Sequence, residues 1–419
     1  MTADGSAWED SLAAWALTVA AALLPVAAVF APLGVAPLGA ATGLATLPQL
    51  LRRRSWRRVD WPLAAGPLLL CLWALISAAW ALDPTQAVKG AAKLATTAVL
   101  GAATVTAAMA VTAGQRRRIG QALSVATAAM VVVLTLDYAI HLSVTHAVLA
   151  LKGDPMVGQK SHLNRGATVV AIVAWPIALL LAGRLRTLPT VLLTGVAMLL
   201  LLLSDSTSTR LAVLAAAAMA GAMAVAPRLA LRALAVLVVM MAVALPTAMR
   251  EVPPPQHTLQ NWTWVPNSAH HRLTIWSFTA QRIAEHPWRG WGMDASRTMP
   301  GADDEVRLKR IAPDGSVAVE VIESMLPLHP HNAVMQVWLE LGLPGVAALV
   351  AFLLVLMRRI DRLEGRLPRG AAAAVLAGTF CVSVVSYGFW QSWWQTALWL
   401  TAAFLVLALH KPAGSNPAG

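Results

Sequence analysis

The sequence has little charge: Asp, Glu, Lys and Arg make up 12% of its 419 residues, about half the share of an average soluble protein. Hydrophobic residues make up 58%, which excludes an ordinary water-soluble domain. Only two cysteines are present, Cys71 and Cys381, and both lie inside long apolar runs, so no framework of disulfide bonds is expected. Basic residues are also absent before the first apolar run, where Asp4, Glu9 and Asp10 stand instead. We therefore expect that run to be a retained helix and not a cleaved signal peptide.

Two kinds of cofactor site are missing as well. No glycine-rich phosphate-binding loop occurs in the chain, which argues against a nucleotide cofactor. His270 and His271 are adjacent, but neighbouring residues on a helix point apart. No acidic residue or cysteine stands beside them at the spacing of metal ligands. We expect neither a metal ion nor any other cofactor.

Long apolar runs, in contrast, fill most of the chain. Runs with roughly the 17–25 residues of a membrane-spanning helix fall near residues 12–31, 35–51, 62–82, 88–113, 119–150, 166–183, 188–204, 209–226, 229–247, 332–357, 371–389 and 393–409. They predict an all-α polytopic membrane protein with about 12 transmembrane helices. We expect a single integral-membrane domain over residues 1–419.

The distribution of charge orients these helices. The formal net charge is +12, which in a soluble protein would suggest binding to nucleic acid. When the N-terminus is placed in the cytoplasm, the loops on that side carry 18 basic and 6 acidic residues, which account for the whole net charge. Every short loop on that side is basic, as the positive-inside rule requires. We therefore expect both termini in the cytoplasm, membrane lipids as the surroundings, and no nucleic-acid partner.

One segment departs from this pattern. Residues 248–330 are rich in Pro, Trp, His and charge, and we expect a large loop outside the cytoplasm, inserted between the ninth and tenth transmembrane helices. The spacing of apolar residues such as Trp276 predicts a helix in this loop that ends at His286. Arg272 is expected at the start of this helix, where the helix dipole is positive.

Three further basic residues stand at the outer ends of helices, where the positive-inside rule disfavours them: Lys160, Arg165 and Arg210. Polar turns lead into helix N-termini here, and their unpaired backbone N–H groups and positive dipole attract anions. The guanidinium of arginine adds a two-pronged donor suited to phosphate. Two alternative roles remain open for these residues: a lone arginine can be an interfacial anchor, and Asp205 can pair with Arg210.

The most informative stretch follows the loop. From His331 to Met357 the pattern is too long for one straight span, at about 1.5 Å per residue across a hydrocarbon core of about 30 Å. Residues 342–345 read Gly-Leu-Pro-Gly and predict a break. We therefore expect an outer helix over residues 331–341, then a bend, then the membrane span.

His331 is the candidate general base. We expect it in the first turn of the outer helix, where the dipole favours a neutral imidazole. The alternative is a histidine that caps a helix at the level of the lipid headgroups. The outer helix also carries a polar residue at every fourth position: Asn332, Gln336 and Glu340.

These patterns together resemble the bacterial O-antigen ligase family (WaaL), which belongs to a wider group with O-antigen polymerases and bacterial O-oligosaccharyltransferases. His-Asn, nine residues and Gly-x-x-Gly at 331–345 resemble the family signature. The Ser/Thr-rich turn ending in Arg210 resembles its outward-facing arginine, and the run from Arg272 to Gly292 resembles part of its large periplasmic loop. The resemblance covers residues 160–346 and the helix count, whereas the first five helices match only in hydropathy.

The resemblance implies a glycosyltransferase C-like helical fold that uses neither a nucleotide sugar nor a metal. It implies an O-antigen ligase of lipopolysaccharide biosynthesis in the bacterial inner membrane, with its active site facing the periplasm. The donor would be an O-antigen linked to undecaprenyl pyrophosphate, and the acceptor a sugar hydroxyl of lipid A-core. The expected site comprises a general base, pyrophosphate-binding residues and supporting residues: His331; Arg210, Arg272, Arg165 and Lys160; and Asn332, Gly342, Gly345 and Trp276. A base and a leaving group on opposite faces of the anomeric carbon would invert its configuration. His329 precedes Pro330, outside the helix and outside the motif, so His329→Ala is expected to retain substantial activity.

Other functions remain open. A polymerase of the same group would lengthen the glycan on its lipid carrier. A protein O-oligosaccharyltransferase would glycosylate protein. Members of that group usually have a longer chain with an additional C-terminal portion, whereas this sequence ends at Gly419. The alternative of a different class is a transporter of anions or lipids. Glu340, Asp137 and the pair of Asp205 with Arg210 favour it, although transporters place such residues near the bilayer midplane.

Overall fold

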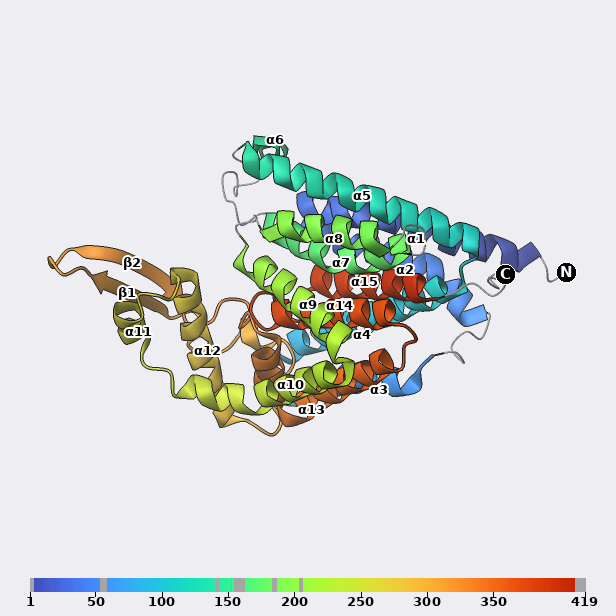
Figure 1. Ribbon diagram of the computed structural model, residues 1–419. Coiled ribbons are helices and arrows are strands. Elements are labelled where there is room, and N and C mark those ends of the chain that lie inside the picture. The colour runs from blue at the N-terminus through green and yellow to red at the C-terminus, as the bar shows by residue number, and fades with distance from the viewer. Residues whose placement is uncertain are drawn as a thin grey trace.

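The computed structural model describes residues 4–52, 59–140, 143–151, 153, 163–182, 187–202 and 206–410. Each apolar run expected from the sequence contains a helix, and these helices form one bundle (Figure 1). Their bounds are α1 Asp4–Phe30, α2 Val35–Arg52, α3 Trp61–Ile76, α4 Pro84–Ala110, α5 Ala113–Ala139, α6 Ser143–Leu151, α7 Asn164–Ala182, α8 Thr187–Leu202, α9 Thr207–Val225, α10 Pro227–Arg250, α13 Ala333–Asp361, α14 Arg366–Ser383 and α15 Ser392–Leu409.

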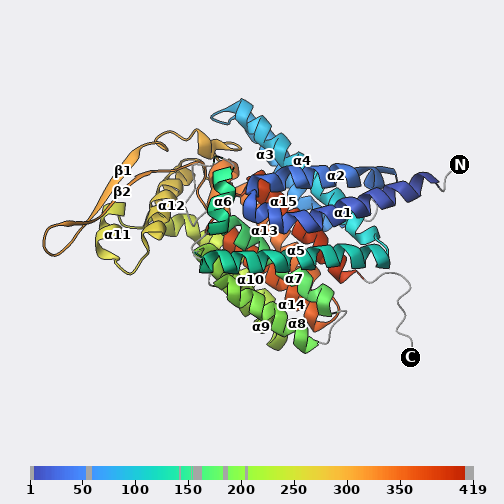
Figure 2. The ribbon, with the colours of Figure 1, turned by 90° about the horizontal axis from the view of Figure 1, so that it is seen from above.

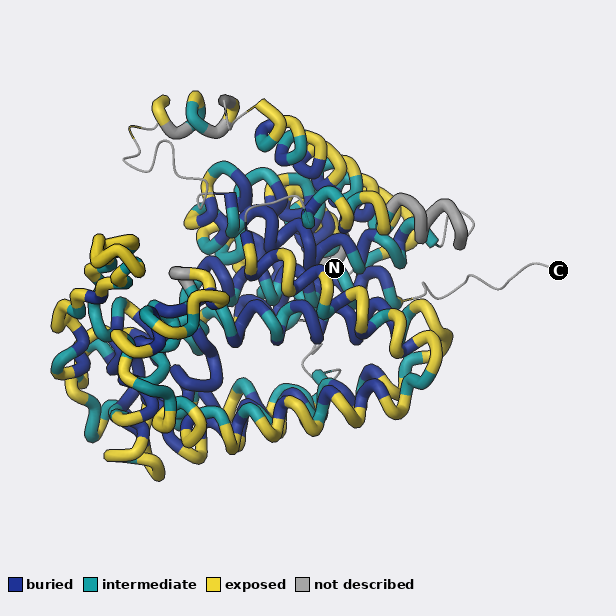
Figure 3. The backbone as a smooth tube through the Cα atoms, turned by 60° about the vertical axis from the view of Figure 1, so that its left-hand side comes forward, coloured by how far each residue is buried: buried dark blue, intermediate teal, exposed yellow. Residues whose placement is uncertain are grey.

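Nine helices in the described residues are long and apolar enough to cross a membrane; α2, α8 and α14 are not among these nine. Large apolar side chains stay exposed on the bundle, for example Leu69 and Leu72 of α3 and Met240 and Val243 of α10. Figure 3 shows exposed residues along the outer faces of the helices. Exposed apolar faces of this extent indicate contact with lipid. The expectation of a polytopic helical membrane protein is confirmed, while the larger number of spans stays a prediction.

Small residues let the helices of the bundle approach closely. Helix α4 packs along both α2 and α15. A Cβ atom on Gly43 of α2 would lie 2.4 Å from the Cβ of Leu100, and one on Gly101 would lie 2.2 Å from the ring of Trp399. Larger residues would force these helices apart, and small residues at such contacts are typical of packed membrane helices.

The packing also gathers segments that are distant in the sequence. Helix α14 packs along α9 and α7, and α15 packs along α7. The segment 384–391, which joins α14 to α15, therefore lies beside the N-termini of α7 and α9. Hydroxyl groups connect them: Thr168 of α7 lies 2.9 Å from Thr209 of α9 and 3.1 Å from the Tyr387 hydroxyl. Ser206 caps α9 by accepting a hydrogen bond from the N–H of Thr209 at 3.2 Å.

Residues 251–332 lie together at one end of the bundle, which we call the loop end (Figures 1 and 2). Helix α12 ends at Glu285, before His286, as expected. Its residues Ile275 and Phe278 pack against Met335 and Leu339 of α13 and so attach the loop to the bundle. The elements of the loop are α11 Pro255–Asn261, α12 Asn267–Glu285, the short helix η5 Ala295–Arg297, and the strands β1 Glu305–Ile311 and β2 Val317–Ser324.

The two strands correct the expectation of an all-α protein. They pair as an antiparallel hairpin, with Leu308 opposite Val321. Polar and apolar residues alternate over residues 305–309 of β1, and the turn contains Asp314-Gly315, a strong hairpin signal. Gly315 has φ 83°, a left-handed conformation that glycine adopts without strain. This alternation spans few residues and carries little weight beside the long apolar runs, which explains the incorrect expectation.

Candidate active site

Helix α13 contains the bend expected at the Gly-Leu-Pro-Gly stretch. Gly342 has φ 61° and ψ −159°, and it divides α13 into an outer part, residues 333–341, and an inner part, residues 343–361. The outer part thus begins two residues later than expected. A Cβ atom on Gly345 would lie 2.4 Å from the Cβ of Leu341. Gly342 therefore forms the bend, and Gly345 leaves the space that the Leu341 side chain occupies beside it.

The large loop crosses α13 at this bend. A Cβ atom on Gly342 would lie 2.6 Å from the Gly290 nitrogen, and one on Gly290 would lie 2.5 Å from the Glu340 carbonyl oxygen. The N–H of Trp291 donates to the Leu339 carbonyl at 2.8 Å. This hydrogen bond satisfies a carbonyl near the break, where the helical partners are lost. Glycines at 290 and 342 allow the two backbones to touch.

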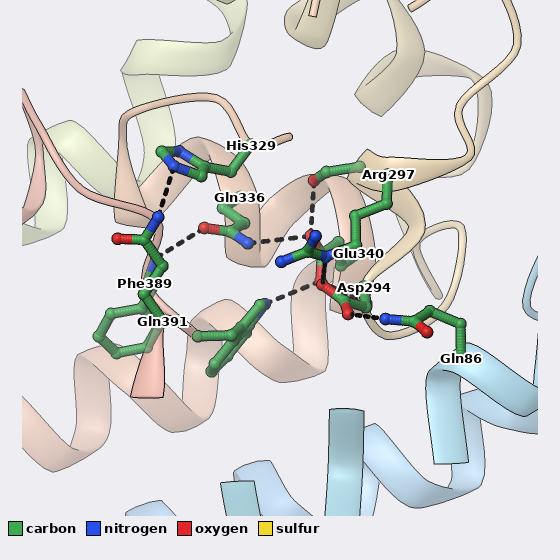
Figure 4. Close-up of polar contacts among 10 residues, drawn as sticks. Gln86, Asp294, Arg297, His329, Gln336, Glu340, Phe389 and Gln391 are labelled. Carbon is green, nitrogen blue, oxygen red and sulfur yellow. Dashed lines mark hydrogen bonds and ion pairs between the residues drawn. The ribbon is translucent and has the colours of Figure 1, made fainter. Parts of the chain in front are cut away.

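Glu340 joins three parts of the protein (Figure 4). Its carboxylate is fully buried and accepts hydrogen bonds from the Asp294 N–H at 2.6 Å, the Ser296 hydroxyl at 2.6 Å, the Gln336 amide at 3.1 Å and the Trp390 indole at 2.8 Å. A carboxylate offers about four acceptor positions, so protein donors occupy all of them. Glu340 thus holds the outer part of α13 to the loop and to the segment after α14, and it is not available to a transported ion.

His331 precedes the outer part of α13 and does not lie in its first turn, which corrects the expectation from the sequence. Asn332 is the N-cap, because its side-chain oxygen accepts a hydrogen bond from the N–H of Met335 at 3.1 Å. His331 itself has φ 54°, a left-handed conformation that costs a non-glycine residue about 1–3 kcal/mol. The surrounding contacts must hold this conformation.

The imidazole of His331 is fixed by the segment between α14 and α15. Its Nδ1 is hydrogen-bonded to the backbone carbonyl of Ser386. Since a carbonyl only accepts, Nδ1 is assigned the proton, and the lone pair lies on Nε2. Burial lowers the pKa of His331 below the usual 6.5, Arg272 and His271 act in the same direction, and the bond to Ser386 opposes them. Burial, and not a helix dipole, therefore keeps this ring neutral and able to accept a proton.

His329 supports this arrangement, and the sequence had not indicated it. The backbone N–H of His331 donates to Nδ1 of His329 at 3.2 Å, and the two ring centroids lie 4.3 Å apart. The His329 ring is held by Gln391, whose amide lies 3.0 Å from Nε2 (Figure 4), and a Cβ atom on Gly388 would lie 2.6 Å from it. Burial lowers the pKa of His329 to about 3, so the ring is neutral. These contacts assign His329 a positioning role, which differs from the expectation that His329→Ala retains substantial activity.

Three arginines from separate elements stand near the two histidines. Arg272 of α12 is near His331, while Arg165 of α7 and Arg297 of η5 are near His329. Arg165 lies over the ring of Trp393, 5.6 Å from its centroid. Their charges disfavour protonation of the histidines and create a positive potential that attracts an anion. Arg272 and Arg165 were expected here, whereas Arg297 lies outside every sequence motif.

Arg210 lies in the first turn of α9, as expected. The hydroxyl of Ser208 in the same turn lies 3.4 Å from that of Ser386, so this helix end adjoins the segment that holds His331. The Arg210 side chain is exposed, and its Nε donates to the Leu202 carbonyl at 3.1 Å. The other expected residues of these two turns, Lys160 and Asp205, lie outside the described residues.

The remaining expected residues lie on α12. The indole N–H of Trp276 donates to the Pro330 carbonyl at 2.8 Å and so holds the residue before His331. His270 lies 3.2 Å from the Trp262 carbonyl, whereas His271 faces strand β2. The adjacent histidines thus point to different partners, as helix geometry requires.

Known proteins resemble the chain over the region that holds this site. Residues 189–350 match the family described as O-antigen ligase. The resemblance expected from the sequence is confirmed. The matched region contains Arg210, Arg272, His331 and the bend of α13, whereas Arg165 and Ser386 lie outside it.

Relatives in Rickettsia species extend the similarity. A candidate polysaccharide ligase of Rickettsia conorii is 27% identical over 257 residues, which are 60% of this chain and 58% of that protein. One of Rickettsia typhi is 26% identical, and the match spans 59% of its length. One of Rickettsia felis is 24% identical over 352 residues, which are 82% of this chain and 80% of the relative. The chain thus spans less than two thirds of the first two relatives.

Proposed function

We propose that the protein is an O-antigen ligase of lipopolysaccharide biosynthesis. It transfers a glycan from undecaprenyl pyrophosphate to a sugar hydroxyl of lipid A-core. The observation that carries the proposal is the neutral imidazole of His331 at one end of a membrane bundle, oriented by the Ser386 carbonyl. Arg272 lies near this imidazole, and two further arginines lie near the adjoining His329. The O-antigen ligase match over residues 189–350, which include His331, Arg272 and Arg297, supports this reaction.

His331 is the general base of this reaction. Its Nε2 takes the proton of the acceptor hydroxyl while that oxygen forms a bond to the anomeric carbon of the donor glycan. The bond between the anomeric carbon and the pyrophosphate oxygen breaks, and its electron pair leaves with undecaprenyl pyrophosphate. A positioned base typically accelerates such a step by about two to four orders of magnitude. Attack from the face opposite the leaving group inverts the anomeric configuration.

The arginines stabilise the leaving group. Negative charge grows on the pyrophosphate as the bond breaks, and Arg272, Arg165 and Arg210 stabilise it electrostatically, with Lys160 in the same cationic set. Guanidinium groups also bind phosphate oxygens through two parallel hydrogen bonds. Protein cations therefore take the part that a metal ion plays in many other phosphate sites, which fits a metal-independent enzyme.

The membrane location follows from the charge of the loops. The basic loops lie in the cytoplasm, so the loop end and the site face the periplasm in the bacterial inner membrane. The polyprenyl chain of the donor then stays in the bilayer while its glycan reaches the aqueous side. Lipid A-core meets the same surface from the same leaflet.

A gel of lipopolysaccharide from a deletion strain tests the proposal. Loss of a ligase removes long and short O-chains alike, whereas loss of a polymerase leaves a band with a single repeat unit. The gene for the parent protein should restore the ladder, and the gene for His331→Ala should not. An unchanged ladder in the deletion strain contradicts a ligase, and the single-unit band assigns a polymerase instead.

A further inference from the structure

Arg297 has an arrangement that differs from an ordinary surface arginine. Its Nε donates to a carboxylate oxygen of Asp294 at 3.1 Å. The structure shows no hydrogen bond from its two terminal nitrogens to any described residue. Its side chain is 39% exposed, against 9% for that of Asp294. The carboxylate thus holds one edge of the guanidinium and leaves the other edge accessible.

Asp294 is itself held by two elements of the bundle (Figure 4). Its second carboxylate oxygen accepts a hydrogen bond from the Gln86 amide of α4 at 2.6 Å, and its backbone N–H donates to Glu340 of α13 at 2.6 Å. Asp294 has φ 61°, a left-handed conformation that is unfavourable for a residue other than glycine. Arg297 is more than a third exposed, so solvent screens its ion pair with Asp294 and the pair adds little to stability. Stability of the pair alone therefore does not account for a buried, strained carboxylate at this position.

Another ion pair in the same loop provides a contrast. Arg282 and Glu285 have the same spacing in sequence and lie 2.9 Å apart, but the side chain of Glu285 is 41% exposed. A terminal nitrogen of Arg282 donates to the Pro300 carbonyl at 3.2 Å, and its guanidinium lies over the ring of Phe278. Arg282 thus uses its guanidinium to hold the loop together. Arg297 has no such structural use among the described residues.

The position of Arg297 indicates what its accessible edge binds. Both Arg297 and Arg165 lie near His329, which contacts the candidate base His331. Arg165 reaches this place from the bundle, and Arg297 reaches it from the loop. We propose that Arg297, oriented by Asp294, binds a phosphate oxyanion of the lipid-pyrophosphate donor through its two terminal nitrogens. This inference rests on the proposed function and adds a ligand-binding residue from the loop.

The chemistry of the donor fits this role. A pyrophosphate diester carries negative charge on both phosphates, and a single arginine cannot pair with all of its oxygens. The two terminal nitrogens of a guanidinium match two oxygens of one phosphate. A carboxylate on Nε fixes the plane of the guanidinium, so less side-chain entropy is lost when the phosphate binds. Asp294 is therefore the positioning residue, and Arg297 is the residue that contacts the donor.

Donor binding to the purified full-length protein in nanodiscs tests the proposal. The probe is undecaprenyl pyrophosphate, the lipid-pyrophosphate part of the donor, without acceptor and with inorganic pyrophosphate as competitor. Arg297→Gln should weaken donor affinity at least about ten-fold, the effect of losing a hydrogen bond to a charged group. Asp294→Asn should weaken it less, because the guanidinium remains but its orientation is lost. Arg307→Gln, at an exposed position of β1, removes the same charge from the same loop; it is the matched control and should bind like the parent.

Arg297→Lys keeps the proposal testable if Arg297→Gln does not fold. Lysine retains the charge and can still pair with Asp294, but it cannot bind phosphate through two planar nitrogens. A weakened donor affinity in a folded Arg297→Lys protein supports the proposal, and parent-like affinity overturns it. Unchanged donor affinity with a raised KM for the acceptor also overturns it, because the anion then belongs to the acceptor. If the parent protein itself does not bind undecaprenyl pyrophosphate, the result contradicts the proposed function, and not only the role of Arg297.

Discussion

His329→Ala is expected to slow glycan transfer while it leaves donor binding intact. The substitution removes the acceptor of the His331 N–H, which lies 3.2 Å from Nδ1 of His329, and the ring that packs against His331 at 4.3 Å. Donor binding depends on the arginines, which stay in place. His331 should then spend less time in the left-handed conformation that directs its imidazole to Ser386.

The size of the effect follows from the lost contacts. An unsatisfied buried N–H costs about 1–3 kcal/mol, and the left-handed conformation of His331 costs about as much without support. Loss of that support should lower the population of the correctly oriented imidazole by about five-fold to about 150-fold. We expect kcat to fall within that range, with little change in donor Kd.

Three variants measured together separate positioning from general damage. His329→Asn should recover much of the rate, because its side-chain oxygen can accept the same N–H. His257→Ala, at an exposed position of α11, is the matched control and should behave like the parent. Transfer rate, donor Kd and thermal midpoint are measured for each in nanodiscs. A parent-like kcat for His329→Ala, or no recovery with asparagine, would refute the positioning role.

Three further predictions concern charge, pH and topology. Arg210→Lys and Arg272→Lys should each lose most transfer activity, because lysine cannot make the two-pronged phosphate contact; parent-like rates for both would make them interfacial anchors. In a pH profile of kcat/KM, the acid limb should have its midpoint below pH 6.5, because the pKa of His331 is lowered from that value and the base works only when neutral. A midpoint at or above pH 6.5 contradicts the buried base. In a Cys-free protein in intact spheroplasts, an impermeant thiol reagent should label Ser316→Cys and not Ser415→Cys; the reverse result inverts the topology.

Local patterns predicted much of the bundle. Long apolar runs require helices because the bilayer leaves no other partner for the backbone. The bend at Gly342 was predictable because Gly-Leu-Pro-Gly cannot continue a straight helix. The four-residue spacing of Gln336 and Glu340 correctly indicated one face of the outer helix, since both side chains lie in the same buried network.

Long-range contacts were not predictable in the same way. The Ser386 carbonyl that orients His331 lies 55 residues further along the chain, and its position depends on how α14 packs on α9 and α7. Any residue has a backbone carbonyl, so the sequence holds no signal for this bond. Arg297 and His329 likewise lack a repeated spacing, and only the folded loop shows what surrounds them. The hairpin is different, because the alternation over residues 305–309 and the Asp314-Gly315 turn were present in the sequence.

Transfer and donor binding by His331→Ala test the central claim most directly. The variant should express, insert and bind undecaprenyl-pyrophosphate donor like the parent. Its transfer rate should fall by about two to four orders of magnitude, the usual effect of losing a positioned base. Asn332→Ala should be intermediate, because it loosens the N-cap beside the base and leaves the imidazole in place. A His331→Ala protein that transfers glycan normally, or that loses donor binding as much as transfer, would contradict the account.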